Sequence, residues 1–589
     1  MVTVAAQWRA TLWPMGTFTT DWDTAPNPTY DVWTVTNGGE ILPGVLSPFT
    51  ATLFAELDGK GMPPLMAPYP TGKRLRLYKP PIGNFFGVSA GRLTLNVGFS
   101  VAAMSCLDPD IAAAMAAQFF QGSDDAVRLL VHAPAEEVAA ALAVATAQRE
   151  AAEAESLAAQ RDLYTEQQSG QSEIDQALAP KAAWKRLQSL LPETIELMNR
   201  HLVVSTAAGE MQVRLAGVIA AGGGDPMAMV GLCSGLGDVE SSKPALALYR
   251  LAQVAKKTAA VRTAFANGDM AAVQTGMHSG AREWQAFADE FDEFIHRYGF
   301  RVQGEADPTV ADWSEEPTFV LSQVRTMMAL GSAEAPAAQV KRAAAGRVAL
   351  ERKVRTALAP ALRPVFDEAV AQAQRFTAMR ELTKAVWVLG MRRLRHPILA
   401  LADGLAAAGH IKSADDLEYC TYTEVGALAA GKEVADLRAA ITKRKRQRRA
   451  AEDWILPNAW VGDATPTRRA EAADTKRLAG LGVSAGTATG TARIVLNTEA
   501  AFARDIEPGE ILVAPFTDTP WTPLFIPAGG VVVETGGMLS HAATVAREFG
   551  IPCVVLVADA TRIIRDGDTI EVDGGAGTVR IVRRARTSR

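Results

Sequence analysis

The pattern of apolar and polar positions divides the chain into parts with different periodicities. Residues 1–100 combine Pro, Gly, Thr and Trp with short alternating runs such as 92–97, so we expect mainly irregular structure with a few strands there. From about 108 to 455, apolar residues recur at three-to-four spacing among Ala, Leu, Glu, Gln, Lys and Arg, which are strong helix formers. This stretch predicts a large, mostly helical domain.

A third pattern begins near residue 477. Short runs of β-branched residues alternate there with glycines, and one helix is predicted from Ser540 to about Phe549. The predicted strands lie at 492–496, 510–513, 530–534, 553–557 and 569–572. The expected fold class is therefore multidomain α plus α/β, with a large helical domain followed by a small domain of strands and one clear helix.

The segment between these two patterns has the composition of a connector. It runs from Asp453 to Lys476 and contains Pro457, Gly462, Pro466 and many polar residues. We therefore expect a first domain at 1–452, a connector at 453–476 and a small domain at 477–585.

Composition and charge exclude some classes of partner. The 589 residues include 60 Lys plus Arg and 65 Asp plus Glu, which gives a net charge of −5 and no basic excess for binding a polyanion. The one basic block, Lys443–Arg449, ends a helical pattern and lacks interleaved aromatic residues, so a solvated helix end is a better interpretation than a nucleic-acid surface. We expect no nucleic acid among the partners.

The cysteines and the N-terminus indicate the compartment. Cys106, Cys233, Cys420 and Cys553 are far apart and form no CxxC pair, so we predict neither a metal site nor a disulfide framework. The N-terminal sequence lacks the pattern of a signal peptide, and no uncharged stretch reaches the roughly 20 apolar residues that span a bilayer. We expect a soluble cytoplasmic protein that does not act at a membrane.

The most informative chemistry lies in one segment, 535–552. A valine-rich strand leads into Gly536 and Gly537, Ser540 is a good N-cap, and His541 falls in the first turn of an Ala-rich helix. The positive end of the helix dipole disfavours imidazolium and keeps a ring nitrogen nucleophilic, while the same backbone donors favour a nearby phosphate. A histidine in this position can accept and donate a phosphoryl group.

A lone histidine at a helix start often only caps or packs, but here strand, double glycine, N-cap, histidine and helix stop occur in one uninterrupted segment. The segment resembles the phosphohistidine domain of the phosphoenolpyruvate-utilising enzymes, which include phosphoenolpyruvate synthase, pyruvate phosphate dikinase and rifampicin phosphotransferase. Further matching runs are 482–493, 518–525, 566–568 and 572–574. Leu539 stands where the dikinases carry a regulatory threonine.

This resemblance implies a small β/β/α swivelling domain in which His541 carries the phosphoryl group. The residues that we expect to support the histidine loop are Thr535, Gly536, Gly537, Ser540 and Arg547. The resemblance also implies that ATP supplies its β-phosphate, with AMP and inorganic phosphate as products.

The first 455 residues resemble the acceptor-binding domain of rifampicin phosphotransferase and its relatives. The matching stretches are 33–48, 91–96, 231–237, 298–305, Trp313 and Arg380-Glu381. One departure is Phe300, because the family usually has a histidine at that position.

Our candidates for the acceptor and phosphate site are Asn37, Glu40, Arg301 and Glu305. Arg301 is suited to charge-assisted contacts with the phosphoryl group, and Glu305 or Glu40 to accepting a hydroxyl proton. An Arg/Glu pair four residues apart is equally well a structural ion pair, so both interpretations stay open.

Two domains of the resembling enzymes have no counterpart in this sequence: the ATP-grasp domain that charges the histidine and the phosphoenolpyruvate-binding barrel. We therefore expect one component of a split phosphotransferase, charged by a separate ATP-grasp subunit that binds ATP and Mg²⁺. A split arrangement resembles the phenol- and cresol-phosphorylating synthases, so the expected substrate is a small phenol and the product an aryl phosphate. The alternatives are phosphorylation of a rifamycin-like antibiotic and a non-catalytic phosphocarrier or regulatory protein.

Overall fold

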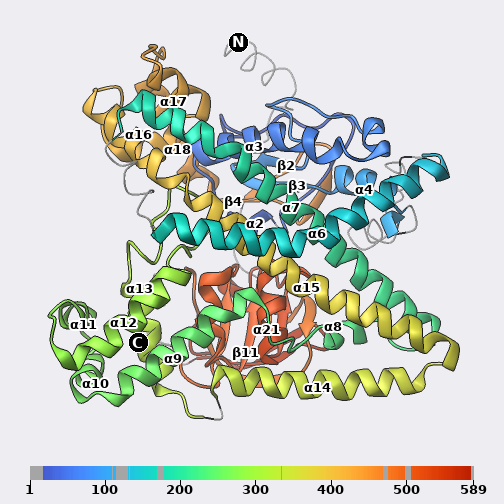
Figure 1. The fold of residues 1–589 in the computed structure, drawn as a ribbon. Coiled ribbons are helices and arrows are strands. Elements are labelled where there is room, and N and C mark those ends of the chain that lie inside the picture. The colour runs from blue at the N-terminus through green and yellow to red at the C-terminus, as the bar shows by residue number, and fades with distance from the viewer. Residues whose placement is uncertain are drawn as a thin grey trace. The chain divides into compact units, whose positions relative to one another are not determined.

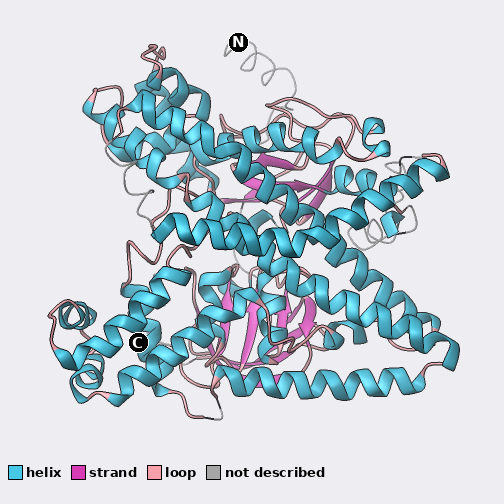
Figure 2. Cartoon of the chain, viewed as in Figure 1, coloured by secondary structure: helices cyan, strands magenta, loops and turns pink. Residues whose placement is uncertain are grey.

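A computed structural model describes residues 18–36, 38–108, 111–113, 131, 133–168, 178–332, 334–468, 475–497 and 506–585. The chain forms two compact units, each built from several segments. Unit 1 contains residues 1–206, 306–309 and 386–471, and unit 2 contains 207–305, 310–385 and 472–589. Helices dominate, and strands gather in a sheet in each unit (Figure 2). The predicted fold class, helical followed by a small strand-rich domain, is confirmed.

Unit 1 is built around a four-stranded antiparallel sheet in the order β2-β3-β1-β5. Its strands are β1 (Val32–Thr34), β2 (Phe86–Ser89), β3 (Arg92–Asn96) and β5 (Ala459–Val461). The helices that belong wholly to this unit include α3 (Pro48–Met66), α4 (Val97–Ser105), α6 (Ala135–Gln168), α16 (Arg395–Ala407), α17 (Tyr422–Ala429) and α18 (Leu437–Ala451).

The expectation of mainly irregular structure before residue 100 is wrong for the 19-residue helix α3. Ser47 caps this helix by accepting a hydrogen bond from the backbone N–H of Thr50 at 3.1 Å. Its prolines suggest loop by composition, but Pro48 lies in the first turn, where no backbone N–H is needed. Pro63 and Pro64 fall near the helix end, so the helix survives them.

The expected connector contains folded structure. Between residues 453 and 476, β4 (Trp454–Ile455) pairs with β6 (Thr467–Arg468), and β5 pairs with β1 in unit 1. The boundary between the two compact units falls at 471/472, and residues 469–474 lie outside the described part. The domain limits 1–452, 453–476 and 477–585 stay a prediction.

The basic block on α18 is not simply a solvated helix end. Arg444 forms two hydrogen bonds with the Glu424 carboxylate at 2.6 and 2.9 Å. Further ion pairs join Lys445 to Asp416, Arg448 to Glu418 and Lys443 to Asp21. The cations therefore tie α18 to neighbouring segments of unit 1, which sequence periodicity alone does not reveal.

Two long helices pass from one unit into the other along the chain: α7 (Pro180–Ala221) and α15 (Arg363–Arg392). Unit 2 also contains η4 (Glu240–Ser242), α8 (Ala228–Leu232), α9 (Lys243–Lys257), α10 (Ala259–Ala266), α11 (Met270–Met277), α12 (Arg282–Tyr298), α13 (Thr318–Ala329) and α14 (Pro336–Ala357). Five aromatic residues at helical spacing form the buried face of α12, namely Trp284, Phe287, Phe291, Phe294 and Tyr298.

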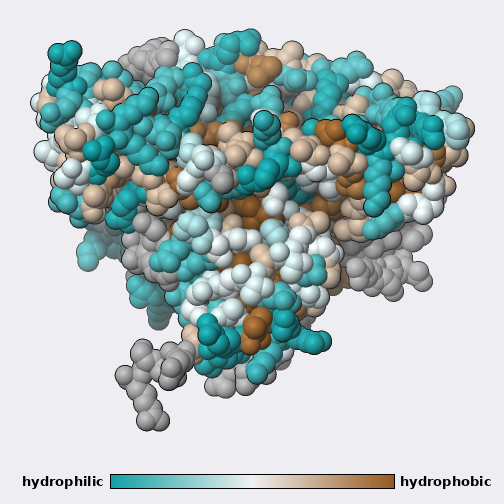
Figure 3. Space-filling view, turned by 90° about the horizontal axis from the view of Figure 1, so that it is seen from below, coloured by the Kyte–Doolittle hydropathy of each residue, from teal (hydrophilic) through white to brown (hydrophobic). Residues whose placement is uncertain are grey.

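Among the described helices, α7 alone is long and apolar enough to cross a membrane by length and composition. This is weak evidence for a span, because a helix in a protein core passes the same test. Gln212 of α7 donates a hydrogen bond to the Thr377 hydroxyl at 3.1 Å within unit 2, as expected for a core helix. On the face drawn in Figure 3, hydrophilic and intermediate residues cover most of the surface, with hydrophobic residues between them in smaller groups.

The second sheet, in unit 2, has eight strands in the order β7-β14-β13-β9-β10-β11-β12-β8. Neighbours from β9 to β12 run parallel, and the outer pairs are antiparallel. The strands are β7 (Arg477–Ala479), β8 (Leu481–Ser484), β9 (Thr487–Ile494), β10 (Ile511–Ala514), β11 (Gly530–Val533), β12 (Cys553–Val555), β13 (Thr569–Asp573) and β14 (Thr578–Arg583).

The hydrophobic pattern explains this arrangement. Every residue of β10, β11 and β12 is buried, as expected for parallel strands covered on both faces, whereas β13 and β14 alternate between buried and more exposed positions. Helix α21 (His541–Phe549) connects β11 to the parallel β12 and lies against the sheet (Figure 1). Its first residue therefore follows the carboxyl end of a central parallel strand, where α/β sheets commonly place their sites.

Candidate functional site

The loop between β11 and α21 presents a histidine at a helix start, as the sequence predicts. Ser540 is the N-cap, and its hydroxyl accepts a hydrogen bond from the backbone N–H of Ala543 at 3.2 Å. Gly536, with φ of 124°, adopts a backbone conformation that other residues rarely reach. The helix then begins at His541 and ends at Gly550, which has φ of 69°.

Arg547 and Thr535 hold this loop in place. The Arg547 guanidinium donates to the Met538 carbonyl at 2.5 Å and to the Val483 carbonyl at 2.7 Å, and its side chain is buried. Burial lowers the pKa of Arg547 to about 10, so it remains protonated at neutral pH. The Thr535 hydroxyl donates to the Pro515 carbonyl at 3.1 Å.

The His541 ring is enclosed, with 2% of the residue exposed. Its Nε2 lies 3.4 Å from the Thr522 hydroxyl, which donates its own proton to the Ser241 carbonyl at 3.0 Å. Phe525 faces the ring edge-on, with centroids 6.0 Å apart. Thr522 therefore links the His541 ring to the η4 segment (Glu240–Ser242) within unit 2.

The surroundings of His541 favour the neutral imidazole. Burial lowers its pKa well below 6.5, and the positive charges of Lys384, Arg301 and Arg380 lower the pKa further. A neutral ring keeps a nitrogen lone pair available for attack on phosphorus. The same three cations would stabilise the negative charge of a phosphoryl group placed on that nitrogen.

We expect the His541 ring resonances to stay at their neutral positions when the pH falls from about 8 to about 5.5, a range in which an ordinary histidine titrates. Because the unfolded chain takes up this proton near pH 6.5 and the folded protein does not, the contribution of His541 to folding stability falls as the pH drops below 6.5. A ¹H–¹⁵N NMR titration, assigned with His541→Gln, measures the shift directly. Titration of His541 near pH 6.5 would contradict the buried, neutral ring.

Arg301 and Glu305, which the sequence analysis selected, lie in the same cluster. Arg301 Nη1 contacts Glu305 Oε1 at 2.5 Å, and both side chains are 1% exposed. The second carboxylate oxygen of Glu305 binds Lys384 at 3.1 Å and the Thr519 hydroxyl at 3.0 Å. Burial acts to raise the pKa of Glu305, but Arg301 and Lys384 outweigh it and hold the pKa below the usual value. Glu305 is therefore a carboxylate that neutralises cations.

Asp518 is a second buried carboxyl in this cluster, and the sequence analysis gave it no role. The residue is fully buried, and its Oδ2 accepts a hydrogen bond from the Gly304 N–H at 2.6 Å. Burial and the neighbouring Glu305 charge raise its pKa well above the usual value. The available signal was its place at the start of the run 518–525, which the resemblance had already singled out.

Lys384 is a further residue of the cluster that was not among the candidates predicted from the sequence. It lies on α15, four residues after Arg380 and therefore on the same side of that helix. Arg380 and Glu381, which form an ion pair, were part of the matching stretches, so helical periodicity could have extended the match by one turn.

Helix α21 makes a further contact with the helical part of unit 2. Both oxygens of the Glu548 carboxylate accept backbone hydrogen bonds, from Leu236 at 2.9 Å and from Gly237 at 2.7 Å. Together with the Asp518–Gly304 bond, this contact packs the strand-rich domain against the helices of the same unit.

Two family models match this chain, one in the helical part that contains Arg301 and one in the strand-rich domain that contains His541. Residues 201–381 match the fourth domain of rifampicin phosphotransferase, and residues 506–577 match the mobile domain of the phosphoenolpyruvate-utilising enzymes. The chain therefore resembles the phosphoenolpyruvate-utilising enzymes over these two ranges. His541 and Asp518 fall in the range that matches the mobile domain, and Arg301 falls in the other matched range.

Curated relatives share part of this sequence. The rifampicin phosphotransferase of a Streptomyces species is 34% identical over 309 residues, and that of Bacillus subtilis is 31% identical over 305 residues; each match covers 50% of this chain and 34% of the relative. A prodigiosin synthesizing transferase of Serratia marcescens is 32% identical over 327 residues, covering 51% of this chain and 34% of the relative. The chain thus spans about a third of the length of these relatives.

The side chains of the other two candidate residues lie outside the described part of the chain. Asn37 lies outside the described residues, and Glu40 belongs to α2 (Gly38–Ile41) of unit 1, with its side chain outside the described part. Their proposed roles stay predictions. In the described ranges, no group of three or more His, Cys, Asp or Glu residues is arranged to hold a metal ion.

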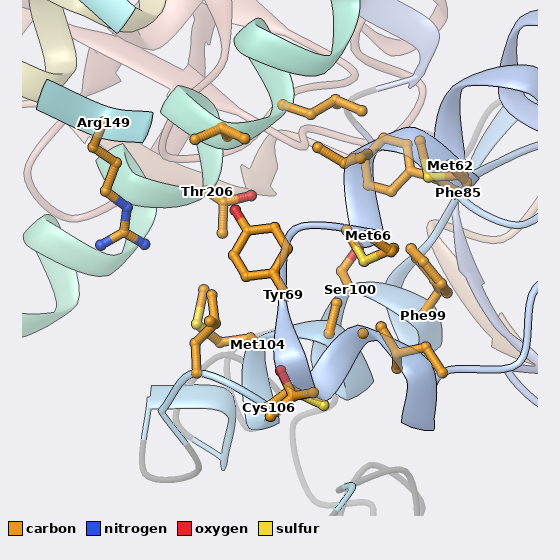
Figure 4. A pocket seen from close by; sticks show the side chains of 18 residues that line it. Met62, Met66, Tyr69, Phe85, Phe99, Ser100, Met104, Cys106, Arg149 and Thr206 are labelled. Carbon is orange, nitrogen blue, oxygen red and sulfur yellow. The ribbon is translucent and has the colours of Figure 1, made fainter. Parts of the chain in front are cut away.

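Unit 1 contains a cavity of about 100 Å³ (Figure 4). Its walls are mostly apolar and come from α3, η1 (Pro70–Arg74), α4, α6 and α7. The side chains that define it include Met62, Met66, Tyr69, Phe85, Phe99 and Arg149. An apolar space of this size accommodates about one small ring.

Proposed function

We propose that this protein is a phosphotransferase component that carries a phosphoryl group on His541 from ATP to the hydroxyl group of a small molecule. The observation that supports this most is a buried histidine at a helix start, whose pKa is lowered by burial and by the charges of Lys384, Arg301 and Arg380. A neutral ring is the form that attacks phosphorus, and the cations favour the phosphorylated form that results.

Two transfers make up the proposed reaction. In the first, a ring nitrogen of His541 attacks the β-phosphorus of ATP, the bond to the α-phosphate oxygen breaks and AMP leaves; water then cleaves the γ-phosphate from the pyrophosphorylated ring as inorganic phosphate. In the second, the acceptor hydroxyl oxygen attacks the phosphohistidine, the P–N bond breaks, and its electron pair returns to the ring. We expect Arg301 and Lys384, whose charges act on His541, to neutralise charge on the phosphoryl oxygens during this second step.

We further propose a separate ATP-grasp subunit as the phosphoryl source, with Mg²⁺ bound to its ATP. Because His541 is 2% exposed, the strand-rich domain must leave its position in unit 2 before a partner reaches the ring. The contacts to be broken include the polar bonds Asp518–Gly304 and those of Glu548, and also apolar packing, because buried residues of both parts belong to one hydrophobic cluster. A domain motion between the two transfers follows from this burial.

For the acceptor, we propose a small phenol or cresol, giving an aryl phosphate. The apolar cavity of about 100 Å³ in unit 1 has a size that suits a single aromatic ring, which supports this choice. The second candidate is a rifamycin, favoured by the named activity of the Streptomyces and Bacillus subtilis relatives. A non-catalytic phosphocarrier or regulatory protein is the alternative outside enzyme chemistry.

The deciding experiment combines this protein with its ATP-grasp partner, Mg²⁺ and ATP labelled at the β- or the γ-phosphate. We expect β-label first on this chain and then in the aryl phosphate, γ-label in inorganic phosphate, and formation of AMP. Phenol, 4-methylphenol and a rifamycin are offered in parallel as acceptors. Label that never reaches this chain would exclude the phosphotransferase, and label that reaches the chain but no hydroxyl compound would favour the phosphocarrier.

A further inference from the structure

Transfer of a phosphoryl group to a neutral hydroxyl requires a group that takes the hydroxyl proton. Glu305 is poorly suited, although it lies in the cluster. Its two oxygens are engaged by Arg301, Lys384 and the Thr519 hydroxyl. These contacts hold its pKa below the usual value, which makes it a weak base.

Two other buried carboxylates of unit 2 also have oxygens engaged by protein groups. Glu381 forms an ion pair with Arg380 on the same helix. Glu548 accepts one backbone N–H with each of its oxygens, from Leu236 and Gly237. Protonation of either carboxylate would therefore weaken the ion pair or the hydrogen bonds that it forms.

Asp518 differs from them in its hydrogen bonding. Its Oδ2 is fixed by the Gly304 N–H at 2.6 Å, whereas its Oδ1 is buried and has no hydrogen-bond partner among the described residues. A buried oxygen without a partner is costly in a folded protein, so a further group is expected to use it. Burial and the Glu305 charge raise the pKa of Asp518, and a raised pKa strengthens a carboxylate as a base.

The position of Asp518 along the chain also suits this task. It directly precedes η7 (Thr519–Trp521), and Thr522, just beyond η7, has its hydroxyl 3.4 Å from His541 Nε2. The electrostatic influence of Lys384 reaches both Asp518 and His541. Asp518 and His541 belong to the same strand-rich domain, so this carboxyl moves together with the phosphoryl group.

We propose that Asp518 is the general base of the second transfer, an inference that rests on the proposed phosphotransferase function. The acceptor oxygen forms a bond to phosphorus while its proton passes to Asp518 Oδ1, and the P–N electron pair returns to the His541 ring. Both side chains are buried once the domain is docked, so the acceptor must bind before docking. Asp518 then arrives with the phosphohistidine and is oriented by the Gly304 N–H.

This assignment predicts an acid limb in the rate of the second transfer. Asp518 must be a carboxylate to act, so the rate falls as the pH drops through its raised pKa. The charged groups that face it are Glu305, which raises the pKa, and Lys384, which lowers it; the Gly304 N–H also favours the carboxylate. Asp518→Asn keeps an oxygen for Gly304 and removes the base.

The test is a single turnover of the full-length protein, charged with phosphoramidate so that no partner is needed. Transfer to 4-methylphenol, 4-nitrophenol and water is followed by ³¹P NMR in wild type and Asp518→Asn. The two proteins should take up equal phosphate on His541. The variant should then transfer to 4-methylphenol roughly 100-fold more slowly or worse, with no acid limb. Transfer to 4-nitrophenol, already ionised in weakly alkaline buffer, should fall by less than roughly 5-fold because no proton must be removed.

A matched control is Thr519→Val, which removes the neighbouring hydroxyl and leaves Asp518 in place. We expect it to slow transfer to both phenols by the same factor and to keep the acid limb. Three results for Asp518→Asn would each overturn the inference. They are a wild-type rate of transfer to 4-methylphenol, an equal loss of rate with both phenols, and a rate that still falls at low pH as in wild type. If the wild-type protein transfers its phosphoryl group only to water, the rate of hydrolysis and its pH dependence are compared between wild type and Asp518→Asn instead. Wild type that takes no phosphate on His541 would overturn the proposed function, and the inference with it.

Discussion

Replacement of His541 by glutamine should abolish the phosphate that is labile to acid and stable to base on the peptide containing residue 541. Glutamine is of similar size and retains hydrogen-bonding capacity for Thr522 but has no ring nitrogen to form a P–N bond. The reaction has no other nucleophile in this position, so the loss should be complete within detection. Mass spectrometry of protein charged with phosphoramidate, and separately from labelled ATP, measures it.

The control for this prediction is His278, an exposed histidine of the helical part of unit 2. A His278→Gln variant should keep full labelling of the peptide that contains His541. Equal label at residue 541 in wild type and His541→Gln would refute the phosphohistidine, because the phosphate would then be on another side chain.

Truncation of Glu305 to alanine should be among the most destabilising single changes in unit 2, by about 3–5 kcal/mol. The change leaves Arg301 and Lys384 buried without their carboxylate and removes the acceptor of the Thr519 hydroxyl. Buried cations that lose their counter-charge cannot regain water, which is the physical origin of the cost. Urea unfolding followed by tryptophan fluorescence measures it.

A surface ion pair of the same unit provides the comparison. Glu571 binds Arg580 at 2.9 Å, with side chains 35% and 47% exposed, so Glu571→Ala should cost no more than about 1 kcal/mol. Glu305→Gln should lie between the two variants, because it removes the charge but keeps an acceptor for Thr519. A Glu305→Ala midpoint displaced no further than that of Glu571→Ala would show that the buried cluster is not held by this carboxylate.

Domain motion connects these two predictions. Thr519 of the strand-rich domain donates a hydrogen bond to Glu305. Glu305→Ala should therefore also weaken the packing of this domain against the helices of unit 2, whereas His541→Gln should not. Phosphate labelling of His541 reports the chemical contribution of the cluster, and urea unfolding reports its structural contribution. Loss of stability without loss of His541 labelling is the expected outcome for Glu305→Ala.

Much of the small domain was predictable because its signals are local. Alternating β-branched runs, the N-cap at Ser540 and the stop at Gly550 act within a few residues, and the structure places the corresponding elements where the pattern predicts them. The histidine at the helix start follows from the same local rules. The N-terminal helix α3 was missed because prolines suggest loop by composition, whereas their positions in the helix decide whether it forms.

The sequence by itself thus determined the fold class, the loop that presents His541 and the residue types suited to phosphoryl transfer. Only the tertiary structure decided that Arg301, Glu305, Lys384 and Asp518 meet at one buried cluster, although up to 217 positions separate them along the chain. It also decided that one buried carboxyl is held as a charged counter-ion while its neighbour has a raised pKa. The reason is physical: capping and periodicity depend on neighbours in sequence, whereas desolvation and charge pairing depend on neighbours in space.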